Sequence, residues 1–71
     1  KPENTDAYFF RGIAKFNLND YKGAKLDFRK TIKLNPFYSN AYHYLGISED
    51  KTGNYKQAFR YHNKAISLSP Y

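Results

Sequence analysis

The chain has 71 residues, which allows one small domain whose hydrophobic core is only just sufficient for stability. It contains no cysteine, which excludes disulfides and thiolate metal sites, and it shows no apolar run of membrane-spanning length and no signal-peptide pattern. The net charge of +6 is compatible with an acidic partner, although a general abundance of Lys, Asn, Tyr and Ile explains it more simply.

The sequence repeats with a period of 34 residues. Residues 5–37 align without a gap on residues 39–71, and 11 of the 33 pairs are identical. The register is also marked by three prolines spaced 34 residues apart, Pro2, Pro36 and Pro70. Self-similarity at this period is the signature of a repeat architecture.

The repeat divides the chain into two units. We expect one unit at 5–38 and a second at 39–71, with 1–4 as a linker or the end of a preceding repeat. Because the first residues continue the register backwards, we expect the segment to belong to a longer array.

Each unit has a turn signal near its middle. Asn19-Asp20 in the first unit corresponds to Gly53-Asn54 in the second. Asn and Gly tolerate the left-handed conformation that ends helices, and Asp and Asn are favourable N-caps for the helix that follows. Each unit is therefore predicted to be a helix, a short turn and a second helix.

The boundaries of four helices follow from these signals. The first begins at Asn4-Thr5-Asp6, and the second runs from Tyr21 to about Leu34, where Pro36 forces the preceding residue out of helical geometry. The third spans roughly 39–52, with Ser39 as its cap, and the fourth runs from Tyr55 to about Leu68. The predicted fold is all-α, with four antiparallel helices stacked as two pairs.

Two glycines lie inside predicted helices at equivalent positions. Gly12 and Gly46 each lower helix stability by about 1 kcal/mol relative to alanine. The repetition indicates close packing, and we expect Gly12 to face Ala24 and Gly46 to face Ala58.

The units resemble tetratricopeptide (TPR) repeats, which have a period of 34 residues and a helix–turn–helix unit. The family pattern has a large aromatic, Leu-Gly, a second aromatic, a small residue, an aromatic, a small residue and a closing proline. The first unit offers Tyr8, Arg11-Gly12, Lys15, Ala24, Phe28, Thr31 and Pro36. The second offers Tyr42, Leu45-Gly46, Glu49, Ala58, His62, Ala65 and Pro70. The resemblance implies a short α-solenoid of two TPR units.

Two departures from this pattern predict interactions. Arg11 stands where leucine is usual, and Asp27 occupies the second helix of the same unit, so we expect an ion pair between them. The second unit has Leu45 and Tyr61 at these places, which predicts an apolar contact instead. Lys15 and Glu49 replace the second aromatic one repeat apart, and they either face each other or remain as separate solvated charges.

The residues do not assemble into a catalytic site. With six acidic residues, two histidines, no cysteine and no Gly-rich phosphate loop, the sequence predicts a protein that is not an enzyme and has no cofactor. His62 fills an aromatic position, and His43 is the only other histidine, so a metal site is not expected.

The resemblance implies a protein-interaction module that holds a peptide or a partner helix along the concave face of its first helices. The groove positions carried over to this chain are Asp6, Phe9, Ile13, Asn17, Asn40, His43, Tyr44, Ile47 and Lys51, with Phe10 near the edge. Phe9 is expected to be an exposed anchor, whereas Ile13 and Ile47 could equally pack between repeats. A TPR subclass that clamps acidic C-terminal tails has Lys and Asn where this chain has Phe9 and Ile13, so an apolar or mixed peptide is favoured.

Two alternatives remain open. The second and fourth helices carry a basic run that could meet phosphates on the convex surface, although such a run is usually a solvated face. It comprises Lys22, Lys25, Arg29, Lys30, Lys33, Lys56, Arg60 and Lys64. The fourth helix also exposes Tyr55, Phe59 and Ile66, which predicts self-association through uncapped repeat ends.

Overall fold

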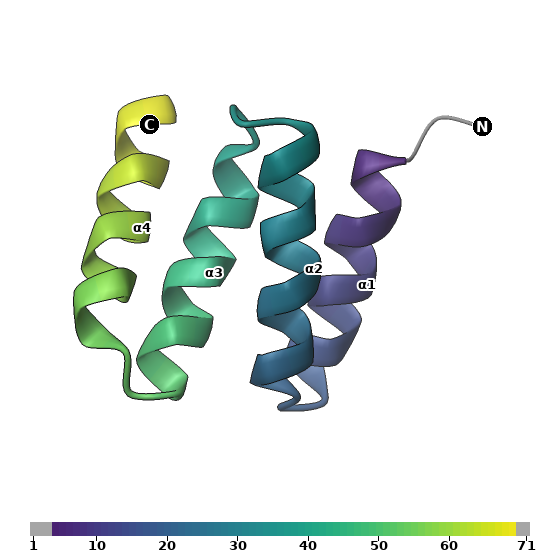
Figure 1. Cartoon of the computed structure of the whole chain (residues 1–71), viewed down its shortest axis with the longest axis horizontal. Helices are drawn as coiled ribbons and strands as arrows, with labels where there is room; N and C mark the ends of the chain where they lie inside the picture. Colours follow the sequence, from purple (N-terminus) through teal and green to yellow (C-terminus); the bar gives the residue numbers. More distant parts are fainter. Residues whose placement is uncertain (1–3, 70–71) are drawn as a thin grey trace.

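The computed structural model describes residues 4–69 as a row of four α-helices. They are α1 (Thr5–Asn17), α2 (Tyr21–Leu34), α3 (Ser39–Lys51) and α4 (Tyr55–Leu68). Each helix packs against the next one in the chain, and α1 and α4 lie at opposite ends of the row (Figure 1). The predicted all-α fold of two stacked helical pairs is therefore confirmed. Pro2 and Pro70, which mark the repeat register in the sequence, lie outside the described residues.

The turns inside the two units have the predicted backbone but different side-chain bonds. Asn19 and Gly53 adopt the left-handed conformation, with φ of 64° and 84°. Asp20 caps α2, because its carboxylate accepts a hydrogen bond from the backbone N–H of Gly23 at 3.0 Å. Asn54 makes no such cap to α4, and its amide instead donates to Glu49 Oε1 at 2.9 Å. The second turn is thus tied to the side chain of α3.

The connection between the units also differs from expectation at one residue. Ser39 was predicted to cap α3, but it is the first residue of the helix and Tyr38 precedes it. The Ser39 hydroxyl instead donates to the carbonyl of Ala65 in α4 at 3.3 Å, so it joins two helices. The Tyr42 hydroxyl donates to the carbonyl of Pro36 at 3.0 Å and fixes this connection to α3.

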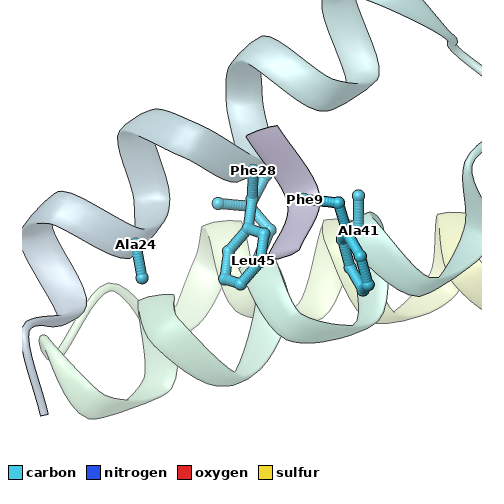
Figure 2. Packing of buried hydrophobic residues seen from close by; sticks show 5 residues of the cluster. All are labelled: Phe9, Ala24, Phe28, Ala41 and Leu45. Atoms are coloured by element: carbon cyan, nitrogen blue, oxygen red, sulfur yellow. The ribbon is translucent and has the colours of Figure 1, made fainter. Parts of the chain in front are cut away.

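The hydrophobic core joins the two units. Its buried cluster contains Phe9 from α1, Ala24 and Phe28 from α2, and Ala41 and Leu45 from α3. In the view of Figure 2, Phe28 and Leu45 lie between Ala24 on one side and Phe9 and Ala41 on the other. Because three helices contribute, this core holds the second unit against the first.

The helical glycines pack closely, but against other residues than predicted. A Cβ on Gly12 would lie 2.7 Å from a ring carbon of Phe28, and one on Gly46 would lie 2.7 Å from His62 Cε1. The expected partners, Ala24 and Ala58, lie about one turn earlier on the facing helices. The aromatic position of each unit therefore occupies the space that each glycine leaves open.

Candidate functional site

The predicted groove positions lie on α1 and α3, and most of them are accessible. Five side chains are exposed: Asp6, Asn17, Asn40, His43 and Lys51. Three are half-buried: Ile13, Tyr44 and Ile47. The 34-residue register makes Ile13 of α1 and Ile47 of α3 equivalent positions of the two units. We call these positions on α1 and α3 the groove face.

Phe9 is the exception, because it is only 6% exposed. Its ring centroid lies 4.9 Å from that of Tyr38, 5.8 Å from Phe28 and 6.0 Å from Tyr44. The prediction of an exposed aromatic anchor at Phe9 is therefore wrong, since side chains from α2, α3 and their connection cover it. The neighbouring Phe10 is 64% exposed and is the accessible aromatic on this helix.

Tyr44 links the groove face to the core. Its ring contacts Phe16 edge-on at 5.4 Å between centroids and stacks on Phe28 at 5.9 Å. On its other side it meets the ring of His43 at 5.3 Å. Tyr44 therefore holds His43 at the surface as well as packing the two units together.

The polar groups of the groove face fall into two kinds. Asp6 accepts a hydrogen bond from the Tyr38 hydroxyl at 2.7 Å, and burial together with this bond and the carboxylate charge raises the pKa of Tyr38 to about 12. Within residues 4–69, Asn17, Asn40 and Lys51 have no hydrogen bond or ion pair to another side chain or to the backbone through their side chains. These three groups keep their hydrogen-bonding capacity for solvent or a ligand.

An ion pair behind α1 confirms the prediction for the first unit. Arg11 donates to both carboxylate oxygens of Asp27, from Nε at 2.9 Å and from a terminal nitrogen at 2.7 Å. Lys15 Nζ lies 3.2 Å from the same carboxylate. The hydrogen bond from Arg11 outweighs the opposing effect of burial and, with Lys15, holds the pKa of Asp27 below its ordinary value.

A second ion cluster joins the two units and was not predicted. The buried carboxylate of Glu49 in α3 accepts from Lys25 Nζ at 3.2 Å and from Arg29 at 3.1 Å, both in α2. Burial raises the pKa of Glu49, but the bonds from Asn54 and Lys25 and the charges of Lys25 and Arg29 outweigh it, so the net shift is downward.

This cluster overturns two expectations. Lys15 and Glu49 do not face each other, because each long side chain reaches an opposite charge on α2. Lys25 is 9% exposed and does not belong to an outward basic face. The sequence contains one signal for the burial of Lys25, because the equivalent residue of the second unit is the apolar Phe59. An apolar residue at this position indicates that the position faces a neighbouring unit.

His62 lies against Gly46 and between two other polar groups. Its Nε2 is 3.3 Å from Asp50 Oδ2, and its ring centroid is 6.1 Å from that of His43. Within residues 4–69, no group of three or more His, Cys, Asp or Glu is arranged to hold a metal ion. Over the same residues, no helix is long and apolar enough to cross a membrane.

Two shallow cavities lie at the ends of the row of helices. One, of about 290 Å³, is lined by Asn4, Ala7, Tyr8 and Arg11 of the α1 end. Another, of about 320 Å³, is lined by Ser39, Asn40, His43, Ala65, Ile66 and Ser69 of α3 and α4. The second cavity borders the groove face through Asn40 and His43.

Stacked helical hairpins with a shared core define the class of helical-repeat scaffolds. Models of the tetratricopeptide repeat match residues 5–38 and 39–71, and the chain belongs to the tetratricopeptide repeat family. These repeats are protein-interaction units that are generally not enzymes, and the chain is a protein-interaction scaffold of this kind.

Solved structures agree with this assignment. Two crystal structures of the protein MamA superpose on this chain with a TM-score of 0.91 and 31% sequence identity. The matches cover 94% of this chain and 39% and 37% of the two MamA chains, so this chain spans less than half of their length. A comparison with curated proteins gives no match.

Proposed function

We propose that the scaffold binds an extended peptide along the groove face of α1 and α3. The observation that carries the proposal is the set of accessible polar groups without a partner on this face, Asn17, Asn40 and Lys51, on either side of the half-buried pair Ile13 and Ile47. Because these side chains are exposed and have no partner within the described residues, their donors and acceptors are free to pair with a ligand.

The chemistry of these side chains fits a peptide backbone. A carboxamide has both a donor and an acceptor, so Asn17 and Asn40 can each pair with a peptide group, which offers the complementary acceptor and donor. Ile13 and Ile47 between them supply an apolar strip for the ligand's side chains. The preferred ligand is therefore an extended segment with at least one apolar side chain.

The second unit supplies the more accessible polar contacts of this face. His43 is exposed and held in place by the Tyr44 ring, while the equivalent Phe9 is buried. Lys51 adds one positive charge at the end of α3, where it favours an acidic residue or a carboxylate of the ligand over a basic one.

A selection of random displayed peptides against the purified chain tests the proposal. A shared sequence motif is expected, and its peptide should bind in calorimetry. Asn40→Ala, at an exposed position, should weaken binding about 5- to 10-fold, which corresponds to the loss of one hydrogen bond. Ile47→Glu should abolish it.

The matched control is Leu26→Glu, because Leu26 is 65% exposed on α2 and the change from an apolar to an acidic residue is the same. Its peptide affinity should equal that of the unaltered chain. No enriched motif for a folded chain, or equal loss in Ile47→Glu and Leu26→Glu, would overturn the assignment of the groove face.

A further inference from the structure

The positive charge of the chain is concentrated on the second helix of each unit. α1 and α3 together carry three acidic and three basic residues, whereas α2 and α4 together carry one acidic and eight basic residues. A general abundance of lysine would place cations on all four helices alike. The charge is therefore a property of α2 and α4, and composition alone does not account for it.

The exposed cations of α2 lie along one side of the helix. Lys22, Arg29 and Lys33 are exposed and, together with Leu26, recur at intervals of four, three and four residues, so they share one face. The fully buried Ala24 lies on the opposite side. The row is about 16 Å long, because eleven residues of α-helix separate its ends.

The repeat places a corresponding row on α4. Lys56, Arg60, Asn63 and Ser67 are the residues equivalent to the row on α2, and all four are exposed. Lys64, beside Asn63, is exposed as well. We call the two rows the basic stripes, with Lys22, Leu26, Arg29 and Lys33 on α2 and Lys56, Arg60, Asn63, Lys64 and Ser67 on α4.

The basic stripes lie outside the contacts between helices. α2 packs on both α1 and α3 and still leaves every residue of its stripe exposed. The equivalent positions of α4 are therefore clear of the contact that joins one unit to the next, so each unit presents a stripe of its own. α3 lies between α2 and α4 (Figure 1). The longest dimension of the molecule is 36 Å, which is about the length of ten base-pair steps of a duplex.

Most cations of the stripes have no counter-ion. Within residues 4–69, five of their side chains make no hydrogen bond or ion pair: Lys22, Lys33, Lys56, Arg60 and Lys64. Arg29 contacts the buried Glu49 at 3.1 Å, but 46% of its side chain remains exposed. The one acidic residue of α2 and α4, Asp27, is 2% exposed and is bound by Arg11. The stripes thus present uncompensated positive charge to solvent.

The residues of the stripes select the class of partner. Protein interfaces are depleted in lysine and enriched in aromatic residues, whereas interfaces with nucleic acid are much more positively charged. The stripes contain a single apolar side chain, Leu26, and no aromatic ring. Single-stranded nucleic acids are usually held by aromatic rings on which their bases stack, while a duplex offers its phosphates to cations alone.

We propose that the basic stripes bind the phosphate backbone of a nucleic-acid duplex without reading its base sequence. Each lysine or arginine that contacts a phosphate releases a condensed counterion, so the affinity depends steeply on salt. If four to six cations make such contacts, the affinity falls roughly 100- to 2000-fold between 50 and 200 mM salt. The groove face belongs to α1 and α3, so a duplex on α2 and α4 leaves it open.

Fluorescence anisotropy of a labelled DNA duplex of about 20 base pairs, measured over a salt series, tests the proposal. Lys22→Gln and Lys56→Gln remove equivalent charges from the two stripes, and circular dichroism should show unchanged helicity because both side chains are exposed and unpartnered. Each variant should bind about 3- to 10-fold more weakly and lower the salt slope by about one. The double variant should bind about 10- to 100-fold more weakly.

The matched control is Lys51→Gln, which removes the same charge from an exposed and unpartnered lysine of α3. It should bind the duplex as the unaltered chain does, and a loss equal to that of Lys22→Gln would overturn the proposal, because only the net charge would then matter. The proposal would also be overturned if the unaltered chain did not bind the duplex at low salt. Equal or tighter binding of a single-stranded oligonucleotide, or of polyglutamate with the same number of charges, would overturn the assignment to a duplex.

Discussion

Replacing the buried Glu49 by glutamine should destabilise the protein more than any surface charge change. The Glu49 side chain is 1% exposed and accepts three hydrogen bonds, from Lys25, Arg29 and Asn54. Glutamine keeps the shape and one acceptor oxygen, but it leaves Lys25, with an 11% exposed side chain, without a counter-ion. Loss of one partner of a buried pair costs about 3–5 kcal/mol, and a retained neutral bond lowers this to about 2–4 kcal/mol.

The loss is large for a domain of this length, whose whole unfolding free energy is about 4–10 kcal/mol. Urea denaturation at neutral pH, followed by circular dichroism, measures it directly. Asp50→Asn is the matched control, because Asp50 is the next residue on α3 and its side chain is 48% exposed. That change should alter the unfolding free energy by about 0.5 kcal/mol or less.

A charge-free double variant separates the lost pair from a general packing defect. Lys25→Met with Glu49→Leu removes both charges and should recover most of the stability, since apolar side chains of similar volume often match a buried ion pair. Arg29, whose side chain is 46% exposed, can turn to solvent. A loss below about 1 kcal/mol in Glu49→Gln would refute the argument that this cluster holds the units together.

The remaining predictions concern the first unit and acid pH. Asp27→Asn should lower the unfolding free energy by about 1.5–3 kcal/mol, and the urea midpoint should fall with it. An unchanged midpoint would contradict a structural role for the ion pair of Asp27. Gly12→Ala should destabilise by about 1–3 kcal/mol, because the new methyl meets the fully buried Phe28 ring, whereas Gly46→Ala should lose less, because the His62 ring it meets is partly exposed. Thermal melts of both variants test the order, and a larger loss at Gly46 would contradict it. Because the pKa of Asp27 is lowered in the folded state, its ion pair contributes its full stabilisation at pH values above the ordinary pKa of 3.8, and this contribution is lost as the pH falls through the folded-state pKa. In thermal melts from pH 7 to pH 2, the melting temperature of Asp27→Asn should therefore fall less than that of the unaltered chain.

The parts of the fold that depend on short-range sequence could be predicted. The turn at Asn19-Asp20 follows from the conformational preferences of two adjacent residues, and Gly53-Asn54 repeats it independently. The Arg11–Asp27 pair was also accessible from the sequence, because both positions change together in the second unit. A repeat thus gives two observations of each position.

The burial of Phe9 could not be predicted in the same way. The resemblance to the repeat family implies that Phe9 lies on the groove side of α1, but its cover comes from Tyr38 in the connection and Tyr44 in the next unit. Neither contact follows from the spacing within α1. The partners of Lys15 and Glu49 were missed for a related reason, since long charged side chains can reach several opposite charges and the choice depends on the packed geometry.

The order of helix contacts has a consequence for how the molecule opens. Among the described helices, α2 packs on α1 and α3, and α3 packs on α2 and α4 and also touches α1, while α4 packs only on α3 and buries only Ala58 and Ala65. A helix that packs on a single neighbour can separate without disturbing the contacts among the other helices. Amide hydrogens of α4 should therefore exchange with solvent through local detachment of that helix, while those of α2 and α3 should exchange only when the whole molecule unfolds.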